Sequence, residues 1–189
     1  MSVTQPIRNK HQVRALAEHF LKRGEPRNYL LITLSAHTAL RISDLLRLTW
    51  DDVYDFSQAR FRDRIAVTEQ KTKKQKLVKL NKKVISALQL CLPAAQRNDP
   101  LIKSRKGGAI SRVQAYRIIR AAAEALNFSI RVSCHSLRKT FGYHAWKNGL
   151  LPAVIMEIYN HSNFATTKRY LGITQDDQDA VYVQLADMF

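Results

Sequence analysis

Three short segments carry side chains of the kinds that handle phosphate esters. Arg41 lies in the apolar stretch ALRISDLL, where burying an unpaired guanidinium would be costly. The segment CHSLRKTF places His135 and Arg138 three residues apart, on one face of a predicted helix. The segment IYNHSNFATTKRYLG places His161 nine residues before Tyr170. Arginine binds anions, neutral histidine accepts a proton, and a tyrosine assisted by a base can be a nucleophile.

Each segment alone also fits a role in stability. Arg41 could form a structural ion pair with Asp44 or Asp51. The H-x-x-R pair could be a helix-cap histidine beside a surface arginine, and Tyr170 could be a half-buried packed aromatic. Taken one at a time, the segments therefore leave both interpretations open.

Charge is the strongest feature of the composition. The 189 residues include 31 Lys and Arg against 15 Asp and Glu, which gives a net charge of +16. Residues 60–83 alone carry ten basic and two acidic side chains. Such an excess indicates a polyanionic partner, with nucleic acid as the first candidate and an anionic membrane surface as the second. A basic protein with a solvated surface is the alternative.

Several classes of protein are disfavoured by what the sequence contains. The 46% hydrophobic content is typical of a globular chain, and no apolar run approaches the length of a transmembrane helix. The first residues, MSVTQPIRNKHQ, lack the apolar region of a signal peptide. Two cysteines, Cys91 and Cys134, argue against a disulfide framework, and the histidines show no common zinc spacing. We expect a cytoplasmic protein without a metal site.

Helical periodicity dominates the chain, so the expected fold class is mainly α with a small antiparallel β-sheet. The exception is the middle, where 60–68 and 75–80 flank the basic EQKTKK and predict a β-hairpin. Ser111 and Ser133 are candidate N-caps for two of the helices. The first helix covers Val13 to Leu21 and ends at Gly24, and the others are predicted over 27–38, 43–49, 82–92, 111–126, 135–148, 152–159 and 163–171.

The order of these motifs resembles the catalytic domain of the tyrosine recombinases, the phage integrase family, over roughly residues 10–175. An arginine in LRISDLL is followed by a hairpin lysine, then H-x-x-R, then H-x8-Y. The stretch KTKKQKLVKL resembles the family's K-G-x-K-x-R-x-V-P-L without a gap, which selects Lys71, with Lys73 and Lys74 as alternatives. The catalytic residues that the resemblance implies are Arg41, Lys71, His135, Arg138, His161 and Tyr170.

The chain departs from the family's usual residues at four places, none of which removes a catalytic group. Thr38-Ala39 replaces Thr-Gly, Asp44 replaces a glutamate, and Lys79 stands where proline is common. Tyr159-Asn160-His161 replaces Leu-Gly-His. Asparagine tolerates a positive φ better than most residues, so we expect the turn before the second histidine to form.

The resemblance implies transesterification on double-stranded DNA. The tyrosine attacks the scissile phosphate and forms a 3′-phosphotyrosine while releasing a 5′-hydroxyl. Arg41, Arg138 and His161 stabilise the phosphate, Lys71 protonates the leaving oxygen and His135 accepts the tyrosine proton. No cofactor, metal or ATP is implied. The alternatives are a type IB-like topoisomerase activity and a non-catalytic basic protein that only binds DNA or RNA.

Further DNA contacts are expected on the hairpin and on helix 111–126. A basic hairpin would follow the phosphate backbone, and the helix could lie in a groove or simply present a solvated face. The candidate DNA-binding residues are Lys73, Lys74, Lys76, Arg112 and Arg117.

For domain organisation, we expect a catalytic domain over 1–175 and an acidic and apolar tail over 176–189, without the N-terminal core-binding domain of many integrases. The chain is then either a short recombinase like the fimbrial invertases or a catalytic fragment. In the family, such a tail often packs onto a neighbouring protomer. The resemblance therefore implies a homotetramer on two DNA sites, with an accessory DNA-bending protein as a further possible partner and no membrane.

Overall fold

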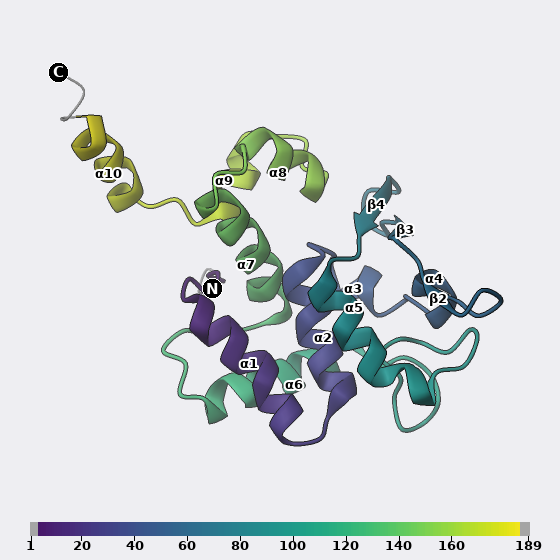
Figure 1. Cartoon of the computed structure of the whole chain (residues 1–189). Coiled ribbons are helices and arrows are strands. Elements are labelled where there is room, and N and C mark those ends of the chain that lie inside the picture. The colour runs from purple at the N-terminus through teal and green to yellow at the C-terminus, as the bar shows by residue number, and fades with distance from the viewer. Residues whose placement is uncertain (1–3, 186–189) are drawn as a thin grey trace.

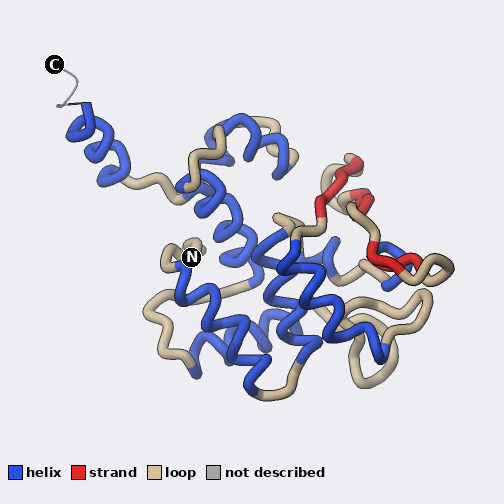
Figure 2. Tube along the Cα trace, viewed as in Figure 1, coloured by secondary structure: helices blue, strands red, loops and turns tan. Residues whose placement is uncertain are grey.

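The computed structural model describes residues 4–185 and consists of helices with two small β-hairpins (Figures 1 and 2). The helices are α1 (Lys10–Lys22), α2 (Pro26–His37), α3 (Ile42–Leu45), α4 (Trp50–Val53), α5 (Lys82–Cys91), the 3-10 helix η1 (Leu92–Ala94), α6 (Arg112–Ala125), α7 (Cys134–Lys147), α8 (Pro152–Tyr159), α9 (Phe164–Leu171) and α10 (Gln175–Leu185). The strands are β1 (Tyr54–Asp55), β2 (Arg60–Phe61), β3 (Arg64–Thr68) and β4 (Gln75–Lys79).

The main core forms around α2, which is buried from Asn28 to Ser35. These consecutive buried residues lie on every side of the helix, so every side must be covered by other elements. Figure 1 shows α1, α5, α6 and α7 around α2, and all four pack against it. A second, smaller cluster of buried side chains joins α7, α8 and α9, with Ile155, Tyr159 and Leu171 at its centre.

The fold class is confirmed, and so is the central hairpin. β3 and β4 pair antiparallel, with Ile65 opposite Val78 and Val67 opposite Lys76. Since residues directly opposite one another share a face, Lys76 lies on the same inner face as these apolar side chains.

Two predictions about the middle of the chain are wrong. The helix over 43–49 ends at Leu45, and a separate helix begins at Trp50. The break arises because the backbone of Leu48 and Trp50 bonds with the 99–101 segment, and because Thr49 and Asp52 form a capping box. The strand over 60–68 divides into β2, which pairs with β1, and β3.

The segment before α1 crosses α7 and reaches the end of α9. The Ile7 amide donates to Thr140 Oγ1 at 2.9 Å, and Lys139 Nζ donates to the Thr4 carbonyl at 2.6 Å. Arg8 donates to the Gly172 carbonyl at 3.0 Å. This segment therefore fixes α7 relative to the end of α9, the two helices that carry most of the candidate site.

The two cysteines of the chain are both partly buried. Cys91 and Cys134 are free, and burial raises the pKa of each thiol to about 11. Among the helices of residues 4–185, none is long and apolar enough to span a bilayer.

Candidate functional site

Tyr170 lies within a group of aromatic rings that we call the aromatic cluster, formed by His135, Tyr159, His161 and Tyr170. The centroid of the Tyr170 ring lies 4.6 Å from that of His161 and 4.9 Å from that of His135, both edge to face. It lies 5.0 Å from the centroid of Tyr159. The structure thus brings together three side chains that the sequence analysis selected, from α7, the turn after α8, and α9.

The first two turns of α7 present His135 and Arg138. Ser133 caps this helix by accepting a hydrogen bond from the Ser136 amide, as predicted. His135 keeps an exposed edge, whereas Arg138 is only 2% exposed. The interpretation of Arg138 as a surface arginine is therefore wrong.

The guanidinium of Arg138 ties two segments of the site together. It donates to the Ala39 carbonyl and, at 3.3 Å, to the Tyr159 carbonyl. Its central carbon lies 5.8 Å from the centroid of the Tyr170 ring. Burial and the positive charge of Arg41 lower its pKa, which indicates that both cations act on the same small region.

Arg41 follows a strained turn at Ala39, where φ is 55°. Its Nη1 lies 2.8 Å from Oε2 of Glu69, which is fully buried at the end of the hairpin strand. The alternative pairings fail, because Asp44 accepts the Gln70 amide and Asp51 pairs with Arg97. Arg41 does have an acidic partner, but that partner comes from the hairpin.

His161 is oriented by its two neighbouring segments. Asn160 ends α8 in the left-handed conformation, with φ at 54°, so the expected turn forms. The Nδ1 atom of His161 lies 3.0 Å from Oγ1 of the buried Thr167 in α9. This bond leaves Nε2 available for a ligand.

The electrostatics of the site favour neutral imidazoles and an incoming anion. Burial, followed by the charges of nearby Lys and Arg side chains, lowers the pKa of His135 and of His161 to about 4. Both rings are therefore neutral near pH 7. A neutral imidazole beside buried guanidinium groups can accept a proton or donate a hydrogen bond.

The hairpin lysines divide into two groups. Lys71, Lys73 and Lys74 lie at the exposed end between β3 and β4. Lys76 points inward, and among residues 4–185 its ammonium is buried without a hydrogen-bond partner. Burial and the charge of Arg138 lower its pKa to about 8. The structure therefore places Lys76, rather than Lys71, among the buried charges of the site.

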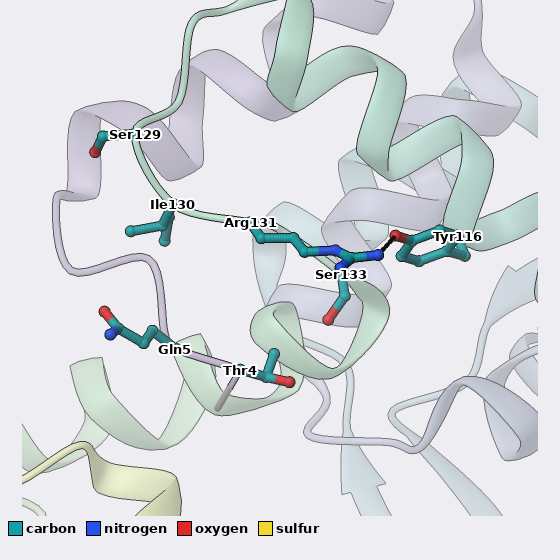
Figure 3. Close-up of a pocket in the computed structure, with 7 residues that line it drawn as sticks. All are labelled: Thr4, Gln5, Tyr116, Ser129, Ile130, Arg131 and Ser133. Atoms are coloured by element: carbon teal, nitrogen blue, oxygen red, sulfur yellow. Dashed lines mark hydrogen bonds between the residues drawn. The ribbon is translucent and has the colours of Figure 1, made fainter. Parts of the chain in front are cut away.

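The remaining DNA-binding candidates lie on α6, where Arg112 and Arg117 are exposed. Close to this helix is a cavity of about 440 Å³ whose lining includes Tyr116, Arg131 and the cap residue Ser133 (Figure 3). In it Arg131 donates to the Tyr116 hydroxyl at 2.8 Å. The cavity is lined by residues other than those of the aromatic cluster, so it is distinct from the candidate site around Tyr170.

Sequence reasoning missed two residues of the site. Glu69 could have been found, because the alternation of Ile65 and Val67 places residue 69 on the inner face of the strand. From the sequence, Tyr159 was noted only because it replaces the leucine that is usual in the family. Its position against Tyr170 and His161 depends on how α8 packs on α7, which no local pattern encodes.

The fold matches solved recombinase structures. The crystal structure of XerA recombinase has a TM-score of 0.77 and 25% identity, over 95% of this chain and 65% of that one. The structure of XerH site-specific recombinase in a post-cleavage complex with palindromic difH substrate also has a TM-score of 0.77. At 19% identity, over 92% of this chain and 51% of XerH, it shows likeness of fold. The architecture is thus that of tyrosine recombinase catalytic domains.

Sequence comparison identifies the family. The model of the Phage integrase family matches residues 8–176, so the chain belongs to this family and is a tyrosine recombinase. The probable integrase/recombinase YoeC of Bacillus subtilis (strain 168) is 36% identical over 183 residues, 96% of this chain and 97% of YoeC. Tyrosine recombinase XerD of Mycobacterium leprae (strain TN) is 30% identical over 159 residues, 78% of this chain. The match spans only 48% of that XerD.

Proposed function

We propose that the protein recombines duplex DNA at specific sites and that Tyr170 is its nucleophile. The Tyr170 oxygen attacks the scissile phosphorus, the bond from phosphorus to the 5′-oxygen breaks, and a 3′-phosphotyrosine forms. The reverse attack by a 5′-hydroxyl reseals the strand, and the phosphodiester energy is kept in the covalent bond. The observation that carries this proposal is the packing of Tyr170 between His135 and His161, beside the buried guanidinium of Arg138.

Each neighbouring group has a chemical role in this proposal. His135, neutral near pH 7, accepts the phenol proton. Arg41, Arg138 and His161 bind the non-bridging phosphate oxygens and stabilise the charge that develops on them. Lys71, which lies outside this group at the exposed end of the hairpin, donates a proton to the departing 5′-oxygen when DNA is bound. With this much positive charge supplied by side chains, the reaction as proposed uses neither a metal nor ATP.

The DNA surface in this proposal extends from the hairpin end to α6. Lys73, Lys74, Arg112 and Arg117 are exposed cations that can contact phosphates on either side of the cleavage point. Lys76 instead adds its charge inside the site, next to Arg138 and Arg41. These contacts would make binding strongly dependent on salt.

The test is a covalent trap. The full chain is incubated with random-sequence duplexes nicked so that the strand released by cleavage diffuses away, and DNA held through denaturation is enriched over successive rounds. We expect an adduct on the enriched site that disappears in Tyr170→Phe and persists in Tyr54→Phe, a tyrosine of β1. Tight binding without an adduct would overturn the proposal in favour of a DNA-binding protein. Relaxation of a plasmid carrying paired sites, without recombinant junctions, would overturn it in favour of a topoisomerase.

A further inference from the structure

Tyr159, the last residue of α8, lies beneath three of the proposed catalytic groups. Its side chain is fully buried. Its ring stacks on His161 with 5.1 Å between centroids and 20° between planes, and its centroid is 5.0 Å from that of Tyr170. The guanidinium carbon of Arg138 lies 4.7 Å from the same ring. One aromatic ring therefore contacts an arginine, a histidine and the proposed nucleophile at once.

Both ends of Tyr159 are held by Arg138. The Tyr159 hydroxyl donates to the Arg138 carbonyl at 2.6 Å, inside α7. In the opposite direction, the Arg138 guanidinium donates to the Tyr159 carbonyl at 3.3 Å. Burial raises the pKa of Tyr159, so its hydroxyl stays protonated and remains a donor. The two residues therefore fix each other through side chain and backbone.

Gly142 makes room for this arrangement. A Cβ atom at residue 142 would lie 2.5 Å from the Tyr159 hydroxyl oxygen and 2.8 Å from Cε2 of its ring. These separations are far below van der Waals contact, so any larger residue at position 142 would displace the Tyr159 ring. Glycine is unfavourable within a helix. Its presence at this point of α7 is explained by the close approach of Tyr159.

We propose that Tyr159, admitted by Gly142, is a positioning residue that sets the orientation of His161, Tyr170 and the Arg138 guanidinium for the reaction. The proposal rests on the proposed function and deepens it. A leucine at residue 159 could fill part of the same space, but it could neither stack on the imidazole nor bond to the α7 carbonyl. Orientation matters because small displacements of reacting groups cost large factors in rate.

The main test uses Tyr159→Leu in the full chain with the trap substrate at saturating DNA. We expect DNA binding and the folded state to persist while the cleavage rate falls by about 100-fold, the scale of a misplaced reactive group. We also expect the His161 titration midpoint, followed by NMR, to rise, because burial is the largest cause of its lowered pKa and the stacked Tyr159 ring covers one face of the imidazole. Tyr54→Leu, which changes a tyrosine outside the aromatic cluster, serves as the control.

Variants of Gly142 distinguish a specific role of Tyr159 from a general loss of packing. Gly142→Ala should slow cleavage strongly in the presence of Tyr159 but add nothing further in the Tyr159→Leu background, because the clash is gone. Additive losses, a wild-type cleavage rate in Tyr159→Leu or an unchanged His161 midpoint would each overturn the inference. If Tyr159→Leu does not fold, Tyr159→Phe, which removes only the hydroxyl bond, must slow cleavage or the inference fails.

The outcomes separate the two proposals. If Tyr170→Phe still forms the covalent adduct, the assignment of the nucleophile is wrong and the positioning role falls with it. If Tyr170→Phe abolishes the adduct while the Tyr159 and Gly142 variants cleave at the wild-type rate, only the positioning role is refuted.

Discussion

Around Tyr170, burial and positive charge act together on the ionisable side chains. Both lower the pKa of Lys76, to about 8, and of His161, to about 4. The pKa of the buried acid Glu69 is lowered as well, but against the effect of burial. Burial alone would raise its pKa, but hydrogen bonds from Thr72 and Arg41 outweigh burial and lower it. At neutral pH the site is thus a net positive surface with neutral imidazoles, which suits a phosphodiester that must be held while a proton is removed.

The chemical roles of the individual hairpin lysines can be distinguished by changing the leaving group of the DNA substrate. A general acid is dispensable when the 5′-oxygen is replaced by sulfur, because a thiolate leaves without a proton. We expect Lys71→Ala to lose cleavage of the natural phosphodiester and regain it on the 5′-phosphorothiolate. Lys76→Ala should lose cleavage of both substrates, because it removes charge beside Arg138 and Arg41. The rate of adduct formation measures both effects.

Lys73→Ala and Lys74→Ala are the matched controls for the lysine series. Both lysines are exposed at the end of the hairpin, so we expect weaker DNA binding and an unaltered cleavage rate once DNA saturates the protein. If the 5′-phosphorothiolate substrate restores cleavage by Lys76→Ala, Lys76 rather than Lys71 is the proton donor. Equal, mild losses in all four variants would contradict a general acid in this hairpin.

Among the elements, the long helices and the β3–β4 hairpin were predictable because each repeats its pattern over several turns or pairs. α6 and α7 begin at the serines that the sequence identified as caps. β1 and β2 were not predictable, since strands of two residues show no period. The break between α3 and α4 depends on bonds to the 99–101 segment, which is distant in sequence.

The site shows the same division between local and long-range information. The arginines, histidines and tyrosine were found because their order matches a family pattern, and Glu69 could be inferred from strand alternation. Tyr159 and Gly142 make a contact between α7 and α8 that appears only in three dimensions. The inward position of Lys76 follows from the register opposite Val67, which the hairpin sequence alone leaves open.

The caps of α6 and α7 allow a prediction about single elements. Ser133→Ala removes the hydroxyl that accepts the Ser136 amide and should cost about 1 kcal/mol of unfolding free energy. It should also slow cleavage, because the uncapped first turn carries His135. Urea unfolding measures the first effect, and adduct formation at saturating DNA measures the second.

Ser111→Ala is the matched control, because Ser111 caps α6 by accepting the Gln114 amide at 3.1 Å. It should cost a similar amount of unfolding free energy and leave the cleavage rate of bound DNA unchanged. If both variants slow cleavage equally, the effect comes from overall destabilisation, and the specific role of the first turn of α7 is refuted.

For the whole molecule, the feature that bears on assembly is α10. α10 extends away from the helical body (Figure 1). Its first turn is fixed by Lys147, whose ammonium lies 2.6 Å from Asp177. Further along, Tyr182 is 75% exposed and Val183 is 72% exposed. Of the apolar tail residues noted in the sequence, Met188 and Phe189 lie outside the described residues. An anchored helix with exposed apolar side chains is suited to packing against a second copy of the chain.

We therefore predict that α10 packs in trans and that the double variant Tyr182→Ser and Val183→Ser uncouples assembly from cleavage. Burying two apolar side chains contributes roughly 3–6 kcal/mol to association, so their loss should shift DNA-bound complexes from tetramers to single protomers. Cleavage at a single nicked site should persist, because Tyr170 lies before α10, while recombinant junctions should disappear. Light scattering on the DNA complexes and a junction assay measure the two outcomes. Leu77→Ser, which changes an exposed apolar residue of the hairpin, is the control, and tetramers in the double variant would contradict the prediction.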